Sequence, residues 1–125
     1  MSRLLVDTHA LLWWLTDDRA LSRTAREALA DPANEPLVSA ASVWEIAIKR
    51  SLGKLSAPED LPERISEEGF SWLAISPAHA WQVRELPAHH RDPFDRMLIA
   101  QALTEHVPVI TTDSRFTEYG VEIRW

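Results

Sequence analysis

His90-Arg91-Asp92-Pro93-Phe94-Asp95-Arg96-Met97-Leu98-Ile99-Ala100-Gln101-Ala102 and, further on, Val109-Ile110-Thr111-Thr112-Asp113 are the segments that decide the fold. Asp92 before Pro93 is typical of a helix start, because Asp accepts from free backbone N–H groups and proline at the first helical position gives up no needed donor. The mostly β-branched run at 107–112 is typical of a short buried parallel strand. Asp95 is therefore expected in the first helical turn, and Asp113 at the end of a strand.

The composition predicts one domain spanning residues 1–125. A chain of 125 residues with 46% apolar residues is long enough to bury a core without covalent cross-links. The chain has no cysteine, which excludes a thiolate metal site and fits a reducing compartment, so we expect a cytoplasmic protein. Asp7 and His9 interrupt any signal-peptide core, and the apolar run Ala10 to Leu15 is far shorter than a membrane span of roughly 20 residues.

The net charge of −6 bears on the kind of ligand that the protein binds. It argues against a protein that coats duplex nucleic acid, because such proteins neutralise many phosphates with Lys and Arg. It does not exclude an enzyme, since acidic residues gathered at one site repel phosphate only until divalent cations occupy that site. An acidic surface also attracts a basic protein partner.

The apolar pattern predicts strands that alternate with helices, which indicates a parallel sheet covered by helices on both faces. One predicted helix begins with a capping box at Ser42 to Glu45. The expected strands are 3–6, 35–39, 72–75, 107–112 and 121–125; the expected helices are 8–15, 22–30, 42–52, 58–68, 77–86 and one that starts at Pro93, with a turn or short helix at 114–119.

Four acidic residues are predicted to lie at one edge of this sheet. Asp7 and Asp113 follow strands, whereas Glu45 and Asp95 are expected in the first turns of helices that start at the same edge. In open parallel sheets the ligand crevice forms beyond the carboxyl ends of the strands, where the strand order reverses. The four side chains are therefore expected to point into one crevice.

Each of these acids also has a purely structural explanation. Asp7 and Asp113 suit helix caps, and Asp95 and Glu45 suit the first turns of helices, where the helix dipole favours negative charge. Helices of such a fold start near the crevice in any case, so caps would gather there without a ligand. The two interpretations differ in chemistry: Asn caps nearly as well as Asp, whereas hard divalent cations need anionic oxygens.

Several segments together resemble the PIN-domain ribonucleases, in particular the VapC toxins of type II toxin–antitoxin systems. The resemblance spans nearly the whole chain, and the block from Asp92 to Ala102 is its most specific part. It lies in Leu5-Val6-Asp7-Thr8-His9-Ala10-Leu11, in Ser39 to Glu45, in Arg91 to Ala102, and in Ile110-Thr111-Thr112-Asp113.

The resemblance implies a PIN-like, Rossmann-like three-layer α/β/α sandwich with a short parallel sheet of about five strands. It also implies Mg²⁺- or Mn²⁺-dependent cleavage of RNA and a cognate antitoxin. Carried over by position, the catalytic set is Asp7, Glu45, Asp95 and Asp113. We hypothesise in-line hydrolysis with Asp7, Asp95 and Asp113 as metal ligands and Glu45 as a ligand or water-orienting base.

Further positions match polar residues around that acidic set. Thr8, Ser39 and Thr111 are candidates to support the ligands, and Asp92 matches a recurrent acid, although its place before Pro93 favours a capping role. His90 and Arg96 match as well with open roles, and Arg96 suits either a phosphate or a neighbouring acid.

Substrate binding needs local positive charge near the crevice. The candidates are Lys49, Arg50, Lys54, Arg91 and Arg96, and for Lys49 and Arg50 a solvated helix face is the favoured interpretation. His9 suits a wall of the site or a packed histidine. The six tryptophans are interpreted as core residues first and stacking platforms second. The surplus apolar surface of Ala10 to Leu15 suits a tight core or a subunit interface, so we expect a homodimer.

Two other kinds of phosphoryl-transfer enzyme fit the pattern poorly. A haloacid-dehalogenase-type phosphatase would need an acid at position 9, where this chain has His9, and a receiver domain would need a lysine after a late strand, whereas the only lysines are Lys49 and Lys54. Another alternative is a non-catalytic PIN-like binding domain that keeps the caps and hydrolyses nothing; the presence of all four acids speaks against it.

Overall fold

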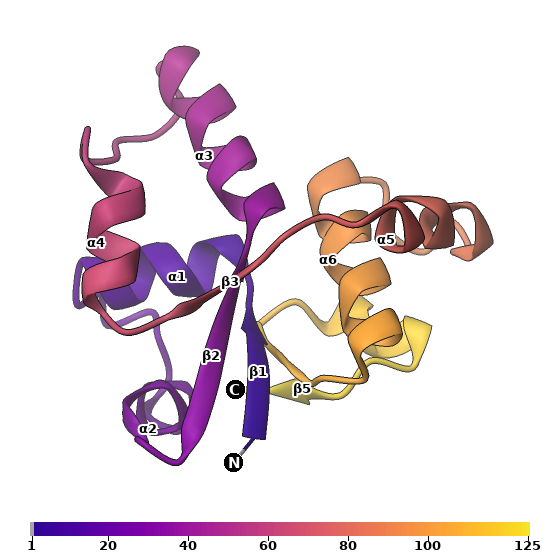
Figure 1. The fold of residues 1–125 in the computed structure, drawn as a ribbon, viewed down its shortest axis with the longest axis horizontal. Coiled ribbons are helices and arrows are strands. Elements are labelled where there is room, and N and C mark those ends of the chain that lie inside the picture. The colour runs from indigo at the N-terminus through magenta and orange to yellow at the C-terminus, as the bar shows by residue number, and fades with distance from the viewer. Residues whose placement is uncertain (1) are drawn as a thin grey trace.

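A five-stranded parallel sheet in the order β3-β2-β1-β4-β5 organises the computed structural model, which describes residues 2–125. Helices cover both of its faces, so the predicted α/β sandwich is confirmed (Figure 1). In chain order the elements are β1 (Ser2–Val6), α1 (Thr8–Leu15), α2 (Arg23–Ala30), β2 (Asn34–Ser39), α3 (Ala40–Ser51), α4 (Leu61–Glu67), β3 (Ser71–Leu73), α5 (Pro77–Gln82), the 3-10 helix η1 (Val83–Glu85), α6 (Pro93–Glu105), β4 (Val109–Ile110), the 3-10 helix η2 (Ser114–Tyr119) and β5 (Ile123–Arg124).

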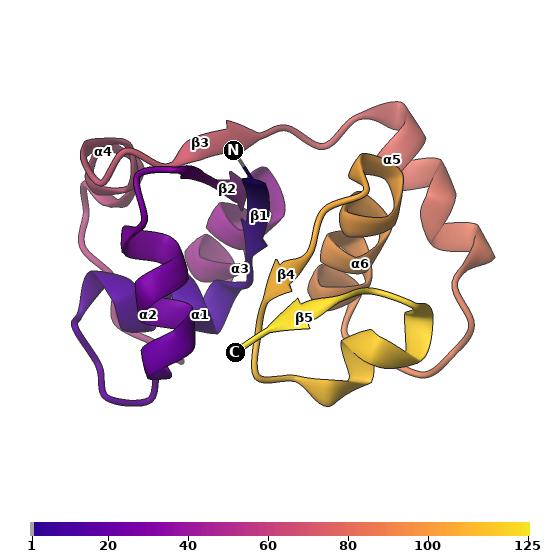
Figure 2. The ribbon, with the colours of Figure 1, turned by 90° about the horizontal axis from the view of Figure 1, so that it is seen from below.

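Side chains that alternate along the strands separate two hydrophobic cores. Leu4 and Val6 of β1 point into the core formed with α1, α2 and α4, whereas Leu5 between them points into the core formed with α6 and η2. Val109 and Ile110 of β4 divide in the same way. This period of two is what a sheet buried on both faces requires, and Figure 2 shows the two groups of helices on opposite sides of the strands.

The strand order reverses between β1 and β4, at the centre of the sheet. After β1 the chain adds β2 and β3 on one side, then crosses back through α5 and α6 to place β4 on the other side. Val6 lies opposite Ile110 in this pair, and the Asp7 amide donates to the Ile110 carbonyl at 3.1 Å. The residues that follow the two strands therefore meet at the carboxyl edge, as the sequence predicted.

The start of α3 corrects one prediction. The helix begins at Ala40 with Ser39 as its N-cap, whose hydroxyl accepts from the Ala41 amide at 3.0 Å, so the capping box predicted at Ser42 is wrong. The physical reason is that β2 runs directly into the helix and its last residue already supplies the cap. Glu45 consequently lies in the second turn of α3 and not in the first.

Several other elements are shorter than expected. β4 covers Val109–Ile110 instead of 107–112, in part because Pro108 has no amide to donate to a ladder. The helix predicted at 77–86 ends at Gln82 and continues as η1. The helix after Asp92 is confirmed, because Asp92 Oδ1 accepts from the Phe94 and Asp95 amides at 2.8 and 3.2 Å. Within residues 2–125, no helix has the length and apolar character to cross a membrane.

Candidate functional site

An open cleft of about 960 Å³ lies at the carboxyl edge, where β1 and β4 end. Four carboxylates line it, against two arginines. The acids are Asp7, Asp92, Asp95 and Asp113, and the arginines are Arg91 and Arg115, with Trp13, His9, His89 and His90 among the other lining residues. The structure thus brings together three of the four acids predicted to be catalytic, and Asp92 with them.

Asp7 is fixed by its place between β1 and α1. Its Oδ1 caps α1 by accepting from the Ala10 amide at 2.8 Å, and the residue is buried. Burial raises the pKa of Asp7, and hydrogen bonds from Thr111 and the Ala10 amide only partly oppose this effect. Asp7 therefore acts as the expected cap and still faces the cleft, so the two interpretations of this residue are compatible.

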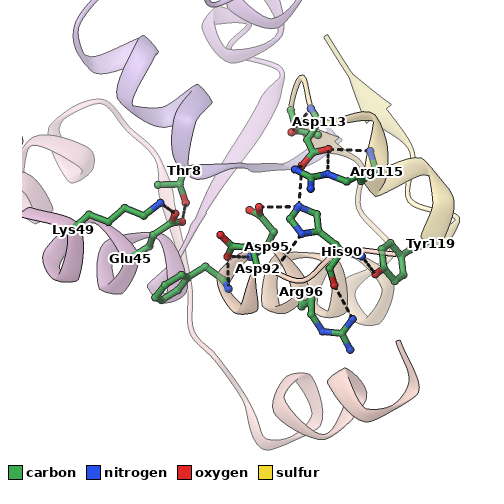
Figure 3. Close-up of polar contacts among 12 residues, drawn as sticks. Thr8, Glu45, Lys49, His90, Asp92, Asp95, Arg96, Asp113, Arg115 and Tyr119 are labelled. Atoms are coloured by element: carbon green, nitrogen blue, oxygen red, sulfur yellow. Dashed lines mark hydrogen bonds and ion pairs between the residues drawn. The ribbon is translucent and has the colours of Figure 1, made fainter. Parts of the chain in front are cut away.

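His90 joins the carboxylates of Asp95 and Asp113. Its Nε2 lies 3.0 Å from Asp95 Oδ2 and 2.9 Å from Asp113 Oδ2 (Figure 3). One potential ligand atom of each of these three residues lies within 4.8 Å of the other two. Helix α6 and the segment after β4 supply the two acids, and the loop before α6 supplies the imidazole.

The hydrogen bonds of His90 define how much charge it compensates. Its Nδ1 accepts from the Asp92 amide at 3.1 Å, which leaves Nε2 as the nitrogen that carries the hydrogen in this arrangement. A single N–H is therefore shared between two carboxylates. The backbone of this residue is held as well, since the His90 amide donates to the Tyr119 hydroxyl at 2.7 Å.

Asp95 lies among several other negative charges. Burial, followed by the negative charges of Asp92, Glu45, Asp7 and Asp113, raises the pKa of Asp95 to about 7. The anionic form of Asp95 is thus costly without an added cation.

Asp113 is the best compensated of the four acids. Arg115 donates to it through Nε (3.0 Å to Oδ1) and through the terminal nitrogen (3.1 Å to Oδ2). Burial raises the pKa of Asp113, but the hydrogen bonds from Arg115 and His90 outweigh it, so this pKa lies below its usual value. The side chain of Arg115 is 55% exposed, so its guanidinium can leave Asp113 and remain in contact with solvent.

Glu45 does not line the cleft. Its Oε1 accepts from the Thr8 hydroxyl at 2.7 Å and its Oε2 from Lys49 Nζ at 2.5 Å, and the Thr8 hydroxyl also contacts Ser42 Oγ at 3.0 Å. The hydrogen bond to Glu45 raises the pKa of Lys49, and the charges of Asp92 and Asp95 contribute further. The charges of Asp92 and Asp95 thus reach Lys49, whose Nζ lies at the carboxylate of Glu45 (Figure 3).

Arg96 differs from both roles considered for it. Its guanidinium donates to four main-chain carbonyls, those of Pro87, His90, Val83 and Leu86, at 2.9, 3.2, 3.3 and 3.1 Å. Arg96 therefore holds no acid, and its donors are committed to the chain between η1 and α6. It positions the loop that carries His90.

The remaining predicted residues support this edge of the sheet. Ser39 caps α3, and the buried Thr111 accepts from the Asp113 amide at 3.0 Å through its hydroxyl. Asp92 is the cap of α6 and lines the cleft, and Arg91 is an exposed lining residue. Arg50 instead pairs with Glu59, away from the cleft.

Sequence reasoning missed two residues of the site. Arg115 was not singled out, although its place two residues after Asp113 allows the fork that the structure shows. His90 was matched by position but left without a role, because its contact with Asp113, 23 positions away, joins segments that only the fold brings together. The spacing His90-Arg91-Asp92, however, permits the observed bond from the Asp92 amide to the ring.

The donor set fits a divalent cation. Carboxylate oxygens from Asp7, Asp95 and Asp113 are the ligands that Mg²⁺ and Mn²⁺ prefer, and the raised pKa of Asp95 shows that positive charge is lacking there. His90 adds an imidazole that an all-carboxylate prediction did not include. Residues from four separate segments thus converge on a site where a cation would relieve repulsion.

The fold and site define an α/β/α sandwich with an acidic cleft at the switch point of its parallel sheet. The chain belongs to the PIN domain family, whose model matches residues 4–122. It is 29% identical over 127 aligned residues to ribonuclease VapC22 of Mycobacterium tuberculosis, with 95% of this chain and 93% of that protein covered. A second relative, ribonuclease VapC16 of the same organism, is 45% identical over 58 residues, or 43% of this chain and 41% of that protein.

Solved structures share the fold along nearly the whole chain. DNA-bound VapBC from Salmonella typhimurium matches with a TM-score of 0.71 at 18% identity, covering 98% of this chain and 97% of that chain. VapBC2 from Rickettsia felis, bound to a promoter DNA fragment, matches with a TM-score of 0.71 at 12% identity, covering 97% and 96%. The predicted membership of the PIN-domain family and the predicted fold are therefore confirmed.

The raised pKa of Asp95 predicts that the unfolding free energy of the metal-free protein depends on pH. The pKa of Asp95 in the folded protein, about 7, exceeds its usual value of 3.8, so the native state binds a proton that the unfolded chain releases. This contribution weakens as pH rises from about 4 to about 7. Asp95→Asn removes the penalty. We expect it to exceed the wild type in unfolding free energy above pH 7, by up to about 4 kcal/mol, and by much less at acidic pH. Denaturant unfolding in a chelator measures this; identical pH profiles would contradict it.

The hydrogen bonds of Arg96 predict that a lysine at this position lowers the stability of the protein. Arg96→Lys keeps the charge but loses the planar fork, so we expect a loss of about 1–3 kcal/mol in unfolding free energy, because several carbonyls lose their donor. The matched control is Arg23→Lys, whose side chain is 92% exposed in its pair with Glu27, and this variant should stay within about 0.5 kcal/mol. An unchanged stability of Arg96→Lys combined with weaker RNA binding would instead return Arg96 to a phosphate-binding role.

Proposed function

We propose that this protein is a divalent-metal-dependent endoribonuclease of the VapC type, the toxin of a type II toxin–antitoxin pair. The observation that carries the proposal is the convergence of Asp7, Asp95 and Asp113 on one cleft with too little positive charge to compensate them. Similarity to two proteins named as VapC ribonucleases supports RNA as the substrate class.

Asp7, Asp95 and Asp113 would hold Mg²⁺ or Mn²⁺, with His90 at the same cluster. Such an ion, when bound, neutralises the carboxylates and polarises a phosphodiester so that water can attack phosphorus. The chain itself supplies position: Asp7 is fixed by α1, Asp95 by the start of α6, and Asp113 by η2. His90 must give up at least one carboxylate when a cation takes its place.

Glu45 has a different place in this proposal from the one expected. Both of its oxygens are bound by Thr8 and Lys49, so it orients water or binds an ion only after one of these donors releases it. In the arrangement described here it holds the Lys49 ammonium beside the acidic cluster. Lys49 can then bind a phosphate next to Glu45. Arg91 and Arg115 line the cleft and can bind a phosphate there.

Partners follow from the similar structures. The solved structures with this fold include VapBC complexes and a toxin–antitoxin complex from Klebsiella pneumoniae, which matches with a TM-score of 0.58 at 20% identity over 89% of this chain and 87% of that chain. We infer a cognate antitoxin, for which the acidic cleft offers charge complementarity to a basic segment. We further infer a homodimer and a cytoplasmic location, where the RNA substrate is found.

A non-catalytic binding domain remains the rival of a different class. The raised pKa of Asp95 favours the enzyme, because a domain that needed only helix caps would be served by neutral Asn or Ser and would not retain a costly buried charge. Asp92 illustrates the difference: it already caps α6, so Asp95 is not required for that purpose.

Asparagine substitutions test the proposal. Asp7→Asn and Asp95→Asn preserve size and hydrogen bonding but remove an anionic ligand, so we expect Mg²⁺-dependent cleavage of RNA to fall by more than about 100-fold, with folding retained. The readout is the cleavage rate of total RNA with Mg²⁺ or Mn²⁺, and a chelator should abolish it. Asp31→Asn, an exposed acid before β2, is the matched control and should keep full activity.

Undiminished cleavage by both folded variants would refute the proposed metal site. Absence of cleavage by the wild type on every RNA tested, with no stabilisation by Mg²⁺ or Mn²⁺, would favour the non-catalytic domain.

A further inference from the structure

An aromatic wall stands beside the acidic cleft. His9 and Trp13 both line the cleft together with Asp7, and their ring centroids are 6.0 Å apart at an interplanar angle of 41°. Behind Trp13 lies Trp125, with its ring centroid 5.7 Å away at 59°. Figure 2 shows why they meet: β5 ends close to α1, so the C-terminal residue reaches the first helix.

The helix that fixes Asp7 also fixes this wall. Asp7 caps α1, and His9 and Trp13 are four residues apart on that helix, so both rings project from one side of it. Ala10 and Leu11 occupy the buried side. His9 is exposed, whereas Trp13 is half-buried and packs against the core together with Trp125. The wall is therefore held rigidly at a constant position relative to a proposed metal ligand.

The charge of the cleft explains why such a wall is needed. Four carboxylates against two arginines, in a chain of net charge −6, leave little positive charge to attract phosphates. Proteins that bind single strands obtain a large part of their affinity from bases stacked on aromatic side chains. Aromatic surface next to a phosphate-binding cleft supplies this contribution without adding fixed positive charge.

We propose that His9 and Trp13 form a stacking site for a nucleobase of single-stranded RNA whose phosphate occupies the adjacent cleft. The inference rests on the proposed nuclease function and names the form of RNA that this site accepts. A base in a duplex is already stacked and paired, so only an unpaired base can reach the ring of Trp13. The flat aromatic surface accepts any base, so the site selects single strands and not a particular sequence.

The test compares two probes that differ only in their bases. One is a short oligoadenylate; the other is a base-free ribose–phosphate oligomer of the same length, and both are bound in Ca²⁺ to limit turnover. We expect the wild type to bind the oligoadenylate about 5- to 150-fold more tightly. Trp13→Ala should abolish this ratio without changing the affinity for the base-free probe, and Trp13→Phe should retain part of it.

The control is Trp81→Ala. Trp81 is 67% exposed and stacks on Arg84, 4.4 Å from its ring centroid, outside the residues that line the cleft. Its removal should leave the affinities for both probes unchanged. If Trp13→Ala does not fold, His9→Ala and Trp13→Phe decide the matter, because both should lower the ratio.

Three outcomes would overturn the inference. The first is a folded Trp13→Ala protein that keeps the wild-type ratio. If that variant also loses self-association in sedimentation, the wall is a subunit interface. The second is an unchanged ratio in both His9→Ala and Trp13→Phe. The third is a wild type that cleaves RNA yet binds both probes equally, which leaves the nuclease proposal intact. Conversely, a base preference that depends on Trp13 in a protein that cleaves no RNA would support the stacking site and refute the nuclease.

Discussion

Repulsion between carboxylates that the fold forces together is the constraint on which this structure depends. Asp7 and Asp113 follow the two central strands, and Asp95 lies in the first turn of α6. Because the strand order reverses between β1 and β4, the carboxylates of these three residues point into the same cleft. Burial and mutual charge then hold the pKa of Asp95 at about 7, although Asp7 and Asp113 also cap the helices that follow them.

The surrounding contacts compensate this repulsion only in part. His90 shares one N–H between Asp95 and Asp113, and Arg115 pairs with Asp113 alone. On the other side, Lys49 is bound to Glu45. These donors keep the acids in place without replacing a divalent ion. Two of them, Arg115 and Lys49, are on partly exposed side chains that can move from an acid to a phosphate. The same arrangement thus suits both a resting protein and a substrate complex.

Local sequence signals predicted the elements that carry the acids. Asp92 before Pro93 marks a helix start by backbone chemistry alone, and the unbroken apolar run Leu4-Leu5-Val6 suits a strand that is buried on both faces. The start of α3 was missed because Ser39 and Ser42 are equally good caps in sequence, and only the end of β2 selects between them. Glu45 consequently lies in the second turn of α3, where Thr8 and Lys49 bind its carboxylate.

Tertiary contacts account for what the sequence did not reveal. The position of His90 depends on a loop held by Arg96 and by Tyr119, whose hydroxyl donates to the Pro87 carbonyl at 2.7 Å. The Tyr119 contact joins segments that are distant in sequence, the Arg96 contacts span six to thirteen positions, and neither has a periodic pattern. Arginine 96 was expected to bind an anion because charge is visible in a sequence, whereas a demand for donors by several carbonyls is not.

Anomalous X-ray scattering from crystals soaked in Mn²⁺ tests the central claim most directly. The account predicts a manganese peak in the cleft, in contact with carboxylate oxygens of Asp95 and Asp113 and held directly or through water by Asp7, with His90 withdrawn from at least one of the two acids. An ordered cleft without a manganese peak, in which His90 still bridges Asp95 and Asp113, would contradict it.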